Sequence, residues 1–418
     1  MTLLVISPDF ISHYSPLAVV ARAAKKAGRR VVVATGINMA PHVKAEGFEW
    51  QMLQLSQSAN SGIAVQNPAI LRFLNATREG PIATIRCQAL DREKDLLWQP
   101  VEVAKNIAKL CKQLDPDDIL VDHISFGSTL GVYATGRSFT TLIPGHPSQL
   151  PVSNERYGIP AVWPKCMQPK ATDLARQEDV TDRVTAKFTE RWNTALQEIS
   201  PTMAPVKDAF RVHGNQVLYN SPKHYHDIDR LKHLPQQHEF VGPLIREEVL
   251  TQTYQTWLNT DDGRPKVYVA LGTFLSYRDD VLGLLARALK QADVRVAMAI
   301  GANTLSAFEP IPKGWLIEPT LPQVGLLRGC DLIIHHGGNN SVQEALGMGV
   351  HQIILPFSTD QFANGADLER SKLATVVSPN DICISSLSKL IKTILDSPKP
   401  QKVIPVSSKL LANALPGR

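Results

Sequence analysis

The stretch from Asp331 to Asn364 constrains the fold more than any other part of this chain. It reads as an apolar strand (Asp331–His335), a Gly-Gly-Asn-Asn-Ser turn, a helix from about Asn340 to Met348 and a second strand (Gln352–Leu355). A polar loop, residues 358–361, is expected to follow. Strand, helix and strand in this order form a βαβ unit, so the sequence predicts a parallel sheet.

The turn in this unit is a candidate anion site. The backbone N–H groups of Gly337 to Ser341 would be unpaired at the start of the helix, and with the helix dipole they would attract a phosphate or diphosphate. His336 could add a donor or a positive charge, and Asp360 and Gln361 would lie beside the same crevice. Two readings without a ligand are open: Ser341-x-x-Glu344 also forms a capping box, and the glycines could make a tight turn.

The whole ordered set resembles the donor-binding signature of the UDP-glycosyltransferases (glycosyltransferase family 1), which have the GT-B fold. The matching residues are His336-Gly337-Gly338-Asn339-Asn340-Ser341, Glu344, Gly349-Val350 and Asp360-Gln361-Phe362-Ala363-Asn364. By this resemblance His336, Gly338, Asn340 and Ser341 would hold the diphosphate. Glu344 would bind the ribose hydroxyls, and Asp360 and Gln361 would contact the donor sugar.

Further donor contacts follow from the same resemblance. Gly272-Thr273 resembles a loop that contacts the phosphates across the cleft, and Pro322-Gln323 resembles the end of the family's Trp-x-Pro-Gln. Thr320 stands where the stacking Trp is usual, so the choice between uracil and thymine is open. His351 replaces the usual Pro.

Length and composition are those of an ordinary globular protein of more than one domain. The chain has 418 residues, 44% of them hydrophobic and 20% charged, with a net charge of +5 and no basic stripe that would indicate a nucleic-acid partner. The cysteines are scattered, and we find neither a signal peptide nor an apolar run near the ~20 residues that span a membrane. We expect a cytoplasmic monomer or homodimer.

Alternating strands and helices predict an α/β, doubly wound architecture from the first residue onward. With the resemblance, they predict two Rossmann-like domains facing across a cleft, with these ranges: an acceptor-binding domain (1–242), a linker (243–265), a nucleotide-sugar-binding domain (266–398) and a tail returning to the first domain (399–418). Residues 56–98 are either an acceptor-lining insert or a loop with two packing helices. We also expect a strand at Trp50–Leu55 and a helix at Pro201–Val212.

The candidate catalytic pair is His13 and Asp122. We expect His13 in the loop after the first strand, before a helix that Pro16 opens, and Asp122 at the end of another strand. In a parallel sheet these ends share one edge, so the two can meet. An Asp that accepts from one imidazole nitrogen raises the basicity of the other. The resemblance supports this pair: Ser12-His13-Tyr14-Ser15-Pro16 is similar to the family's Gly-His-x-x-Pro.

Other chemistries lack their motifs. The chain contains no Walker P-loop, no G-x-G-x-x-G after the first strand and no G-x-S-x-G. The histidines at 224, 226, 233 and 238 are interpreted as surface residues and not as a metal site, and His335 as a packed core residue. The resemblance implies a hexosyltransferase: an inverting enzyme that moves a sugar from a UDP or dTDP donor to a hydroxyl of a small hydrophobic acceptor, such as a secondary-metabolite aglycone, without a metal. The alternatives are a nucleotide-sugar epimerase and a non-catalytic partner of another glycosyltransferase.

Overall fold

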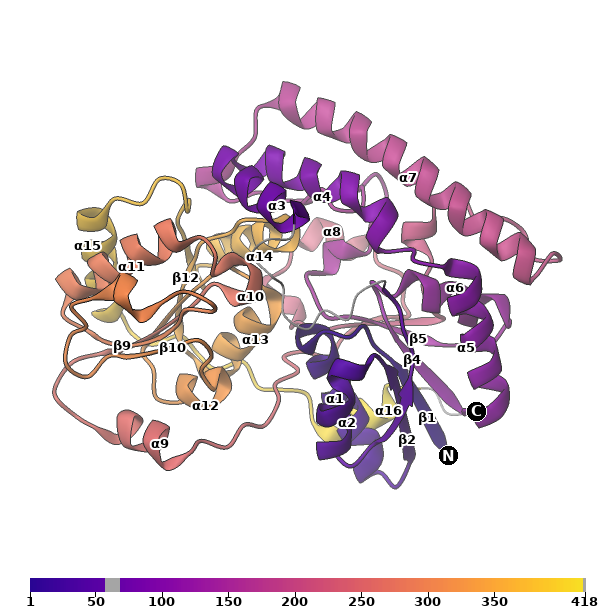
Figure 1. Cartoon of the computed structure of the whole chain (residues 1–418), viewed down its shortest axis with the longest axis horizontal. Helices are drawn as coiled ribbons and strands as arrows, with labels where there is room; N and C mark the ends of the chain where they lie inside the picture. Colours follow the sequence, from indigo (N-terminus) through magenta and orange to yellow (C-terminus); the bar gives the residue numbers. More distant parts are fainter. Residues whose placement is uncertain (57–67, 416–418) are drawn as a thin grey trace.

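Two parallel sheets dominate the computed structural model, which describes residues 1–56 and 68–415 apart from the side chains of 93–95 and 273–274. The strand orders are β3-β2-β1-β4-β5-β6-β7 and β10-β9-β8-β11-β12-β13. In Figure 1 the two sheets form two lobes. The first sheet consists of β1 (Thr2–Ile6), β2 (Arg30–Thr35), β3 (Glu49–Met52), β4 (Asp118–Asp122), β5 (Thr140–Ile143), β6 (Gln216–Tyr219) and β7 (His238–Phe240). The second consists of β8 (Lys266–Ala270), β9 (Arg295–Ala299), β10 (Leu316–Glu318), β11 (Leu332–His335), β12 (His351–Ile354) and β13 (Thr375–Val376).

Helices cover both faces of each sheet. Around the first sheet lie α1 (Ile11–Lys26), α2 (Ala40–Ala45), α3 (Pro68–Glu79), α4 (Pro81–Asp95), α5 (Pro100–Leu114), α6 (Phe126–Ala134), α7 (Ala171–Ile199) and α8 (Ile228–Lys232). The later helices are α9 (Gln252–Asn259), α10 (Gly272–Leu275), α11 (Asp279–Ala292), α12 (Gln323–Leu327), α13 (Asn339–Met348), α14 (Thr359–Arg370), α15 (Ile384–Leu395) and α16 (Ser408–Asn413).

Strand β1 shows why the sheet is covered on two sides. Its residues alternate in direction, so Leu3 and Val5 pack in a core with α1, whereas Leu4 and Ile6 pack in a second core with α5. All four side chains are completely buried. A strand that is apolar on both faces belongs to a parallel sheet between two helical layers. The predicted doubly wound α/β architecture is therefore confirmed.

The last helix returns to the first sheet. Leu411 and Leu415 share a core with residues of α1, and α16 lies beside α1 in Figure 1. The first sheet ends at Phe240 and the second begins at Lys266. The segment 243–265 thus remains our proposal for the linker between two domains.

Several local predictions were wrong. The expected helix Pro201–Val212 is absent, and only a 3₁₀ turn (Ala209–Arg211) forms there. Pro205 lacks an N–H and disfavours helical geometry at the residue before it, which outweighs the helical pattern. The third strand is Glu49–Met52 and not Trp50–Leu55.

Two helices begin earlier than predicted, and both changes concern the site. Helix α1 starts at Ile11, so His13 lies in its first turn and not in a loop, and Pro16 lies inside the helix. Helix α14 starts at Thr359, so the predicted polar loop at 358–361 is mostly the first turn of a helix. A capping box between Ser358 and Gln361 stabilises this early start.

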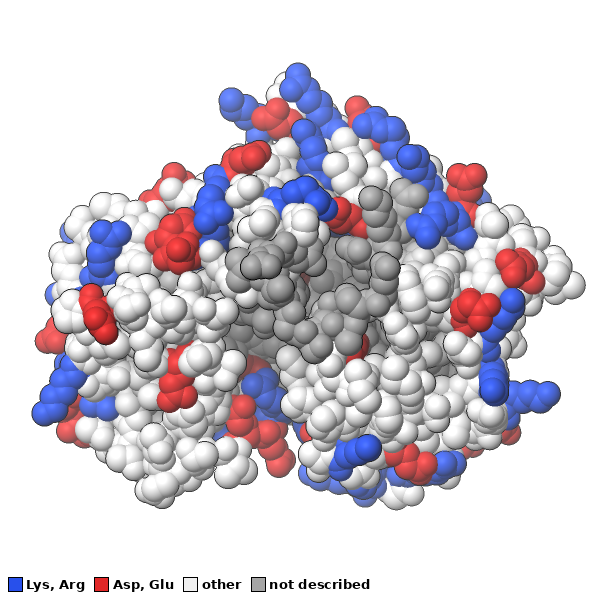
Figure 2. Space-filling model, viewed as in Figure 1, with Lys and Arg blue, Asp and Glu red and all other residues white. Residues whose placement is uncertain are grey.

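The insert after the third strand packs as two helices under α7. Helices α3 and α4 contact each other, α4 contacts α7, and Figure 1 shows them together at one side of the molecule. Part of the predicted insert, residues 57–67, lies outside the described residues. Figure 2 shows positive and negative side chains intermixed over the visible face. No helix within the described ranges is long and apolar enough to cross a membrane.

Candidate active site

A cavity of about 490 Å³ lies where the carboxyl ends of the two sheets face each other. Side chains from both halves of the chain line it, as expected for parallel sheets that bind ligands at this edge. Ten of the predicted site residues are in its lining: His13, Gly272, Gln323, His336, Gly338, Asn340, Ser341, Glu344, Asp360 and Gln361. Gly337 and Pro322 adjoin lining residues in the chain without lining the cavity, Asp122 lies behind His13, and the side chain of Thr273 is outside the described part.

His13 and Asp122 meet at the carboxyl edge of the first sheet. The Nδ1 atom of His13 lies 2.9 Å from Oδ2 of Asp122. The Asp122 side chain is completely buried, and its Oδ1 accepts from the backbone N–H of Ile124 at 2.9 Å. A carboxylate fixed in this way accepts a hydrogen bond from the Nδ1–H group and leaves the Nε2 lone pair free. Since 21% of the His13 side chain is exposed and His13 lines the cavity, that lone pair is available to a ligand.

The electrostatic surroundings make His13 a stronger base. Burial lowers the pKa of His13, but the charge and hydrogen bond of Asp122, with the charge of Asp360, outweigh it and hold the pKa above its ordinary value. The neighbouring His123 behaves differently, because burial lowers its pKa to about 4 and its Nε2 contacts the carbonyl oxygen of Gln149 at 2.8 Å. His13 is therefore the histidine suited to proton abstraction.

The ring of His336 adds no positive charge beside the cavity. Burial lowers the pKa of His336 to about 4, so its imidazole is neutral at pH 7. Its ring occupies space left by two predicted glycines. A Cβ atom on Gly338 would lie 2.4 Å from Nε2 of His336, and one on Gly272 would lie 3.1 Å from Cε1. Both glycines thus make room for the ring beside the cavity.

Helix α13 begins at the cavity without a side-chain cap. Its N-cap is Gly338, and Ser341 and Glu344 do not form the capping box that was the alternative reading. The Oγ atom of Ser341 instead accepts from Gln323 at 3.0 Å. The helix therefore presents its first N–H groups and its positive end to the cavity, as an anion site requires.

Glu344 is held by two partners, one of which the sequence did not indicate. Gln323 donates to its Oε2 at 2.5 Å, and Arg246 donates to its Oε1 at 3.0 Å. Pro322 immediately precedes α12 and so places Gln323 at the start of that helix. Arg246 comes from the predicted linker and also lines the cavity. No motif in the sequence singled out Arg246.

Asp360 and Gln361 lie in the first turn of α14. The Oε1 atom of Gln361 accepts from the backbone N–H groups of Phe357 and Ser358, so its NH₂ group is the part that can face a ligand. Burial raises the pKa of Asp360, while His146 and His13 oppose this shift. Asp360 therefore lies within electrostatic reach of His13.

Asn340 connects the two halves at the mouth of the site. Pro16 has no N–H, which leaves the carbonyl oxygen of Ser12 without its helical partner. The side-chain amide of Asn340 donates to this oxygen at 2.7 Å. Asn339, which the sequence did not single out, donates to the carbonyl oxygens of Pro144 and Asn220. The turn therefore holds the halves together as well as lining the cavity.

The histidine cluster was interpreted only partly correctly. His224 and His233 are exposed, but His226 and His238 are buried, contrary to the prediction. Burial is tolerated because each ring has a polar partner. Nδ1 of His238 lies 2.8 Å from the hydroxyl of Tyr219, and Nδ1 of His226 lies 2.8 Å from Oδ2 of Asp367. His335 is a core residue as predicted, hydrogen-bonded to Gln352.

Within the described residues, three side chains could together ligate a metal, namely His146, His226 and Asp367, and none of them lines the cavity.

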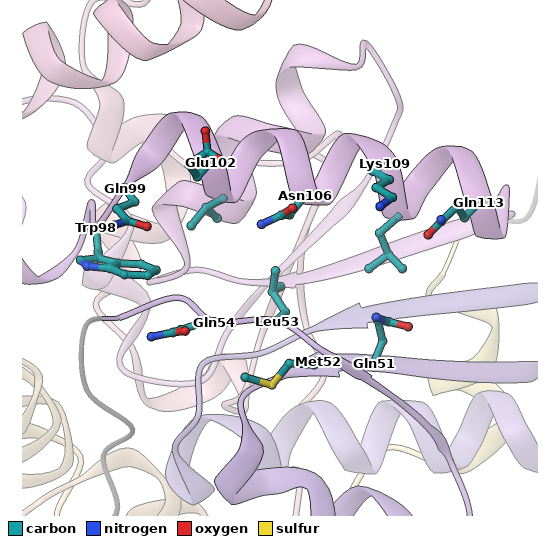
Figure 3. Close-up of a pocket in the computed structure, with 12 residues that line it drawn as sticks. Gln51, Met52, Leu53, Gln54, Trp98, Gln99, Glu102, Asn106, Lys109 and Gln113 are labelled. Carbon is teal, nitrogen blue, oxygen red and sulfur yellow. The ribbon is translucent and has the colours of Figure 1, made fainter.

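A second cavity, of about 440 Å³, lies between strand β3 and helix α5. Figure 3 shows amide side chains from both elements pointing into it, with Trp98 at one end. Its lining contains none of the predicted catalytic or donor-binding residues. The cleft between the sheets is therefore the candidate active site.

Known proteins resemble this chain in sequence and in structure. Residues 283–416 match the family model described as Erythromycin biosynthesis protein CIII-like, C-terminal domain. The chain is 24% identical over 289 residues to a demethyllactenocin mycarosyltransferase of Streptomyces fradiae, which covers 69% of this chain and 58% of that protein. It is 27% identical over 335 residues to the NDP-glycosyltransferase YjiC of Bacillus licheniformis, which covers 78% of each.

Solved structures show the same fold over almost the whole chain. The glycotransferase of kitacinnamycin superposes with a TM-score of 0.69 at 17% identity, covering 99% of this chain and 92% of that one. The glycosyltransferase VinC, solved in complex with dTDP, gives 0.63 at 16% identity, covering 99% and 94%. The fold is therefore GT-B, and the matching relatives and solved structures are named as glycosyltransferases. The C-terminal part is similar to that of an erythromycin biosynthesis protein, in agreement with the resemblance seen in the sequence.

Proposed function

We propose that this protein transfers a hexose from a nucleoside-diphosphate sugar to a hydroxyl group of a small hydrophobic acceptor, with inversion at the anomeric carbon. One observation carries the proposal. His13, bonded to Asp122, and the uncapped start of α13 line the same cavity, one from each half of the chain. A base for an acceptor and an anion site for a leaving group are the two parts that this reaction needs.

The reaction would proceed in one displacement. Nε2 of His13 takes the proton of the acceptor hydroxyl as its oxygen attacks the anomeric carbon. The bond from that carbon to the phosphate oxygen breaks, and its electron pair leaves with the diphosphate. Asp122 stabilises the imidazolium that forms. Attack from the side opposite the leaving group inverts the configuration.

The charge that develops on the diphosphate would be stabilised by fixed dipoles. The N–H groups at the start of α13, the neutral imidazole of His336 and the hydroxyl of Ser341 are the available donors. Thr273 is proposed as a further donor. These groups need no reorganisation during the reaction, so we propose that no metal is required.

We propose a pyrimidine nucleotide, UDP or dTDP, as the carrier. VinC was solved with dTDP, and a spinosyn rhamnosyltransferase of the same fold was solved with thymidine diphosphate, so dTDP is the first candidate. Thr320 lines the cavity at the position of the usual stacking Trp, which leaves room around the base. The names of the relatives point to a natural-product aglycone as acceptor.

A thermal-shift panel with UDP, dTDP, GDP and ADP, with and without EDTA, tests the donor site. We expect a rise in Tm with one pyrimidine diphosphate that EDTA does not alter. The matching nucleotide sugar is then assayed with an aglycone library. Conversion of the nucleotide sugar without any aglycone would favour the epimerase, and the absence of both binding and turnover would favour a non-catalytic partner protein.

A further inference from the structure

Three buried side chains outside the cavity join the two halves of the molecule. Oδ2 of Asp367, on α14, lies 3.1 Å from Nε2 of His146 and 2.8 Å from Nδ1 of His226. His146 follows β5 and His226 follows β6, so both belong to the half of the chain that carries His13. No more than 3% of any of the three side chains is exposed. We call this group the His–Asp–His clamp.

The hydrogen atoms of the clamp can be assigned from its neighbours. Nδ1 of His146 accepts from the backbone N–H of Ser148 at 3.1 Å, so its proton is on Nε2 and points at Asp367. Nε2 of His226 lies 2.9 Å from the hydroxyl of Ser221, and its Nδ1 donates to Asp367. Every nitrogen of the two rings is therefore engaged. Unlike His13, neither histidine has a free lone pair for catalysis.

Charge balance indicates hydrogen bonds and not a bound metal. Burial lowers the pKa of His226 to about 4, so its ring is neutral at pH 7. The single negative charge of Asp367 is matched by Arg370, whose guanidinium lies 2.7 Å from Oδ1. A divalent cation would displace both ring protons and add two positive charges beside Arg370. Such an excess of buried charge is costly.

The clamp acts on the same helix that presents the predicted sugar contacts. Asp360 lies seven residues before Asp367, which is two helical turns, or about 10 Å, along the same face of α14. The clamp ties that face to segments following β5 and β6. Asp360 also interacts electrostatically with both His13 and His146. Fixing Asp367 therefore fixes the first turn of α14 relative to His13.

We propose that His146, Asp367 and His226 are positioning residues, which hold Asp360 and the donor sugar in register with His13 across the cleft. The proposal rests on the glycosyltransferase activity proposed above. It goes beyond that activity because it assigns the alignment of donor and base to a buried group that neither touches the substrate nor lines the cavity. A displacement of about 1 Å between reacting groups can cost about 10²-fold in rate.

Two variants of His226 form a matched pair that tests the geometry. The amide of Asn places its NH₂ group near the position of Nδ1, whereas that of Gln places it near Nε2. His226→Asn therefore keeps the donor to Asp367, and His226→Gln removes it. We expect kcat within about threefold of wild type for the Asn variant and about 10- to 100-fold lower for the Gln variant. Asp367→Asn, which replaces an acceptor oxygen by a donor, is expected to resemble the Gln variant.

Binding separates positioning from a general loss of structure. We expect the Kd for the nucleoside diphosphate to stay within about twofold in all three variants, measured by calorimetry. The additional affinity that the sugar gives the nucleotide sugar should fall only in His226→Gln and Asp367→Asn. This second readout does not depend on transfer, so it tests the clamp even if the wild-type protein transfers no sugar and the proposed function fails.

Three results would overturn the proposal. Equal kcat for the Asn and Gln variants would show that the donor to Asp367 does not matter. A parallel loss of diphosphate affinity would indicate a purely structural role. Stoichiometric zinc in the purified wild-type protein, lost in both His226 variants, would make the group a metal site instead.

Discussion

Two pairs of histidine and aspartate in this protein have opposite properties. In the first, His13 contacts Asp122 at 2.9 Å, and in the second, His226 contacts Asp367 at 2.8 Å. The His13 side chain is 21% exposed at a cavity, whereas that of His226 is 3% exposed. The pKa is raised for His13 and lowered to about 4 for His226.

The difference shows that a carboxylate partner alone does not make a histidine a base. Burial lowers the pKa of both rings, but the charge of Asp122 with that of Asp360 exceeds this effect at His13. At His226 burial outweighs the hydrogen bond and charge of Asp367, and the neighbouring ring of His146 and the charge of Arg230 oppose protonation further. His226 also has no free nitrogen. The first pair is therefore suited to proton transfer and the second to holding two elements together.

The largest expected effect comes from removing the proposed base. His13→Ala should lower kcat by about 10³-fold, because His13 is the one histidine among the described lining residues whose pKa is raised. Binding of the nucleoside diphosphate, measured by calorimetry, should be unchanged. Turnover within tenfold of wild type would show that the comparison of the two pairs has assigned the base wrongly.

The buried pair should contribute to the loss of stability in acid, as should the other buried histidines with lowered pKa values. The folded pKa of His226, about 4, is below its unfolded value of 6.5, so the unfolded chain binds the extra proton between these values. Stability should thus fall as the pH decreases through this window, by about 3 kcal/mol from His226 alone. His226→Asn keeps the hydrogen bond to Asp367 but does not titrate. Urea unfolding at several pH values should therefore show that the free energy of unfolding of this variant depends less steeply on pH. His13, with a raised pKa, contributes in the opposite sense: its stabilisation is complete below pH 6.5 and is lost as the pH rises through its folded pKa. An unchanged slope in His226→Asn would contradict the assignment.

Replacing the partner of the proposed base should change the pH profile. Asp122→Asn removes the charge that stabilises the imidazolium, so the pKa of His13 should fall. The acid limb of kcat/KM, which reports the free enzyme, should move to lower pH, while the rate on the plateau falls by about 10²-fold because the base is weaker. An acid limb that stays in place would mean that another group titrates there.

The sequence predicted the cavity better than the contacts around it. The strand–turn–helix–strand unit at Asp331–Asn364 has local spacing that fixes its geometry, and His13 and Asp122 follow from the rule that parallel strands share one edge. The clamp has no such signal. Its hydrogen-bonded partners are 141 and 221 residues apart, and no local pattern connects them. Only a pairing of buried polar groups, which the fold creates, reveals it.

The starts of two helices differ from the prediction for separate reasons. The start of α14 depends on the capping box between Ser358 and Gln361, although the polar composition of this segment is equally typical of a loop. The start of α1 at Ile11 leaves Pro16 inside a helix, and the freed carbonyl oxygen is satisfied by Asn340 from the other half of the chain. A local cap thus sets the start of α14, whereas a long-range partner satisfies the backbone that the early start of α1 leaves exposed.

The smallest expected effect is at His224, two residues from His226 and exposed. Its ring packs edge-on against Tyr225 at 5.7 Å. His224→Ala should change the free energy of unfolding by no more than about 0.5 kcal/mol, as for most surface substitutions. It should leave both kcat and the acid slope as in wild type, because His224 is neither at the cavity nor in the clamp. If the slope flattened as much as in His226→Asn, proximity in sequence and not burial against Asp367 would account for the acid response, and the contrast between the two pairs would no longer hold.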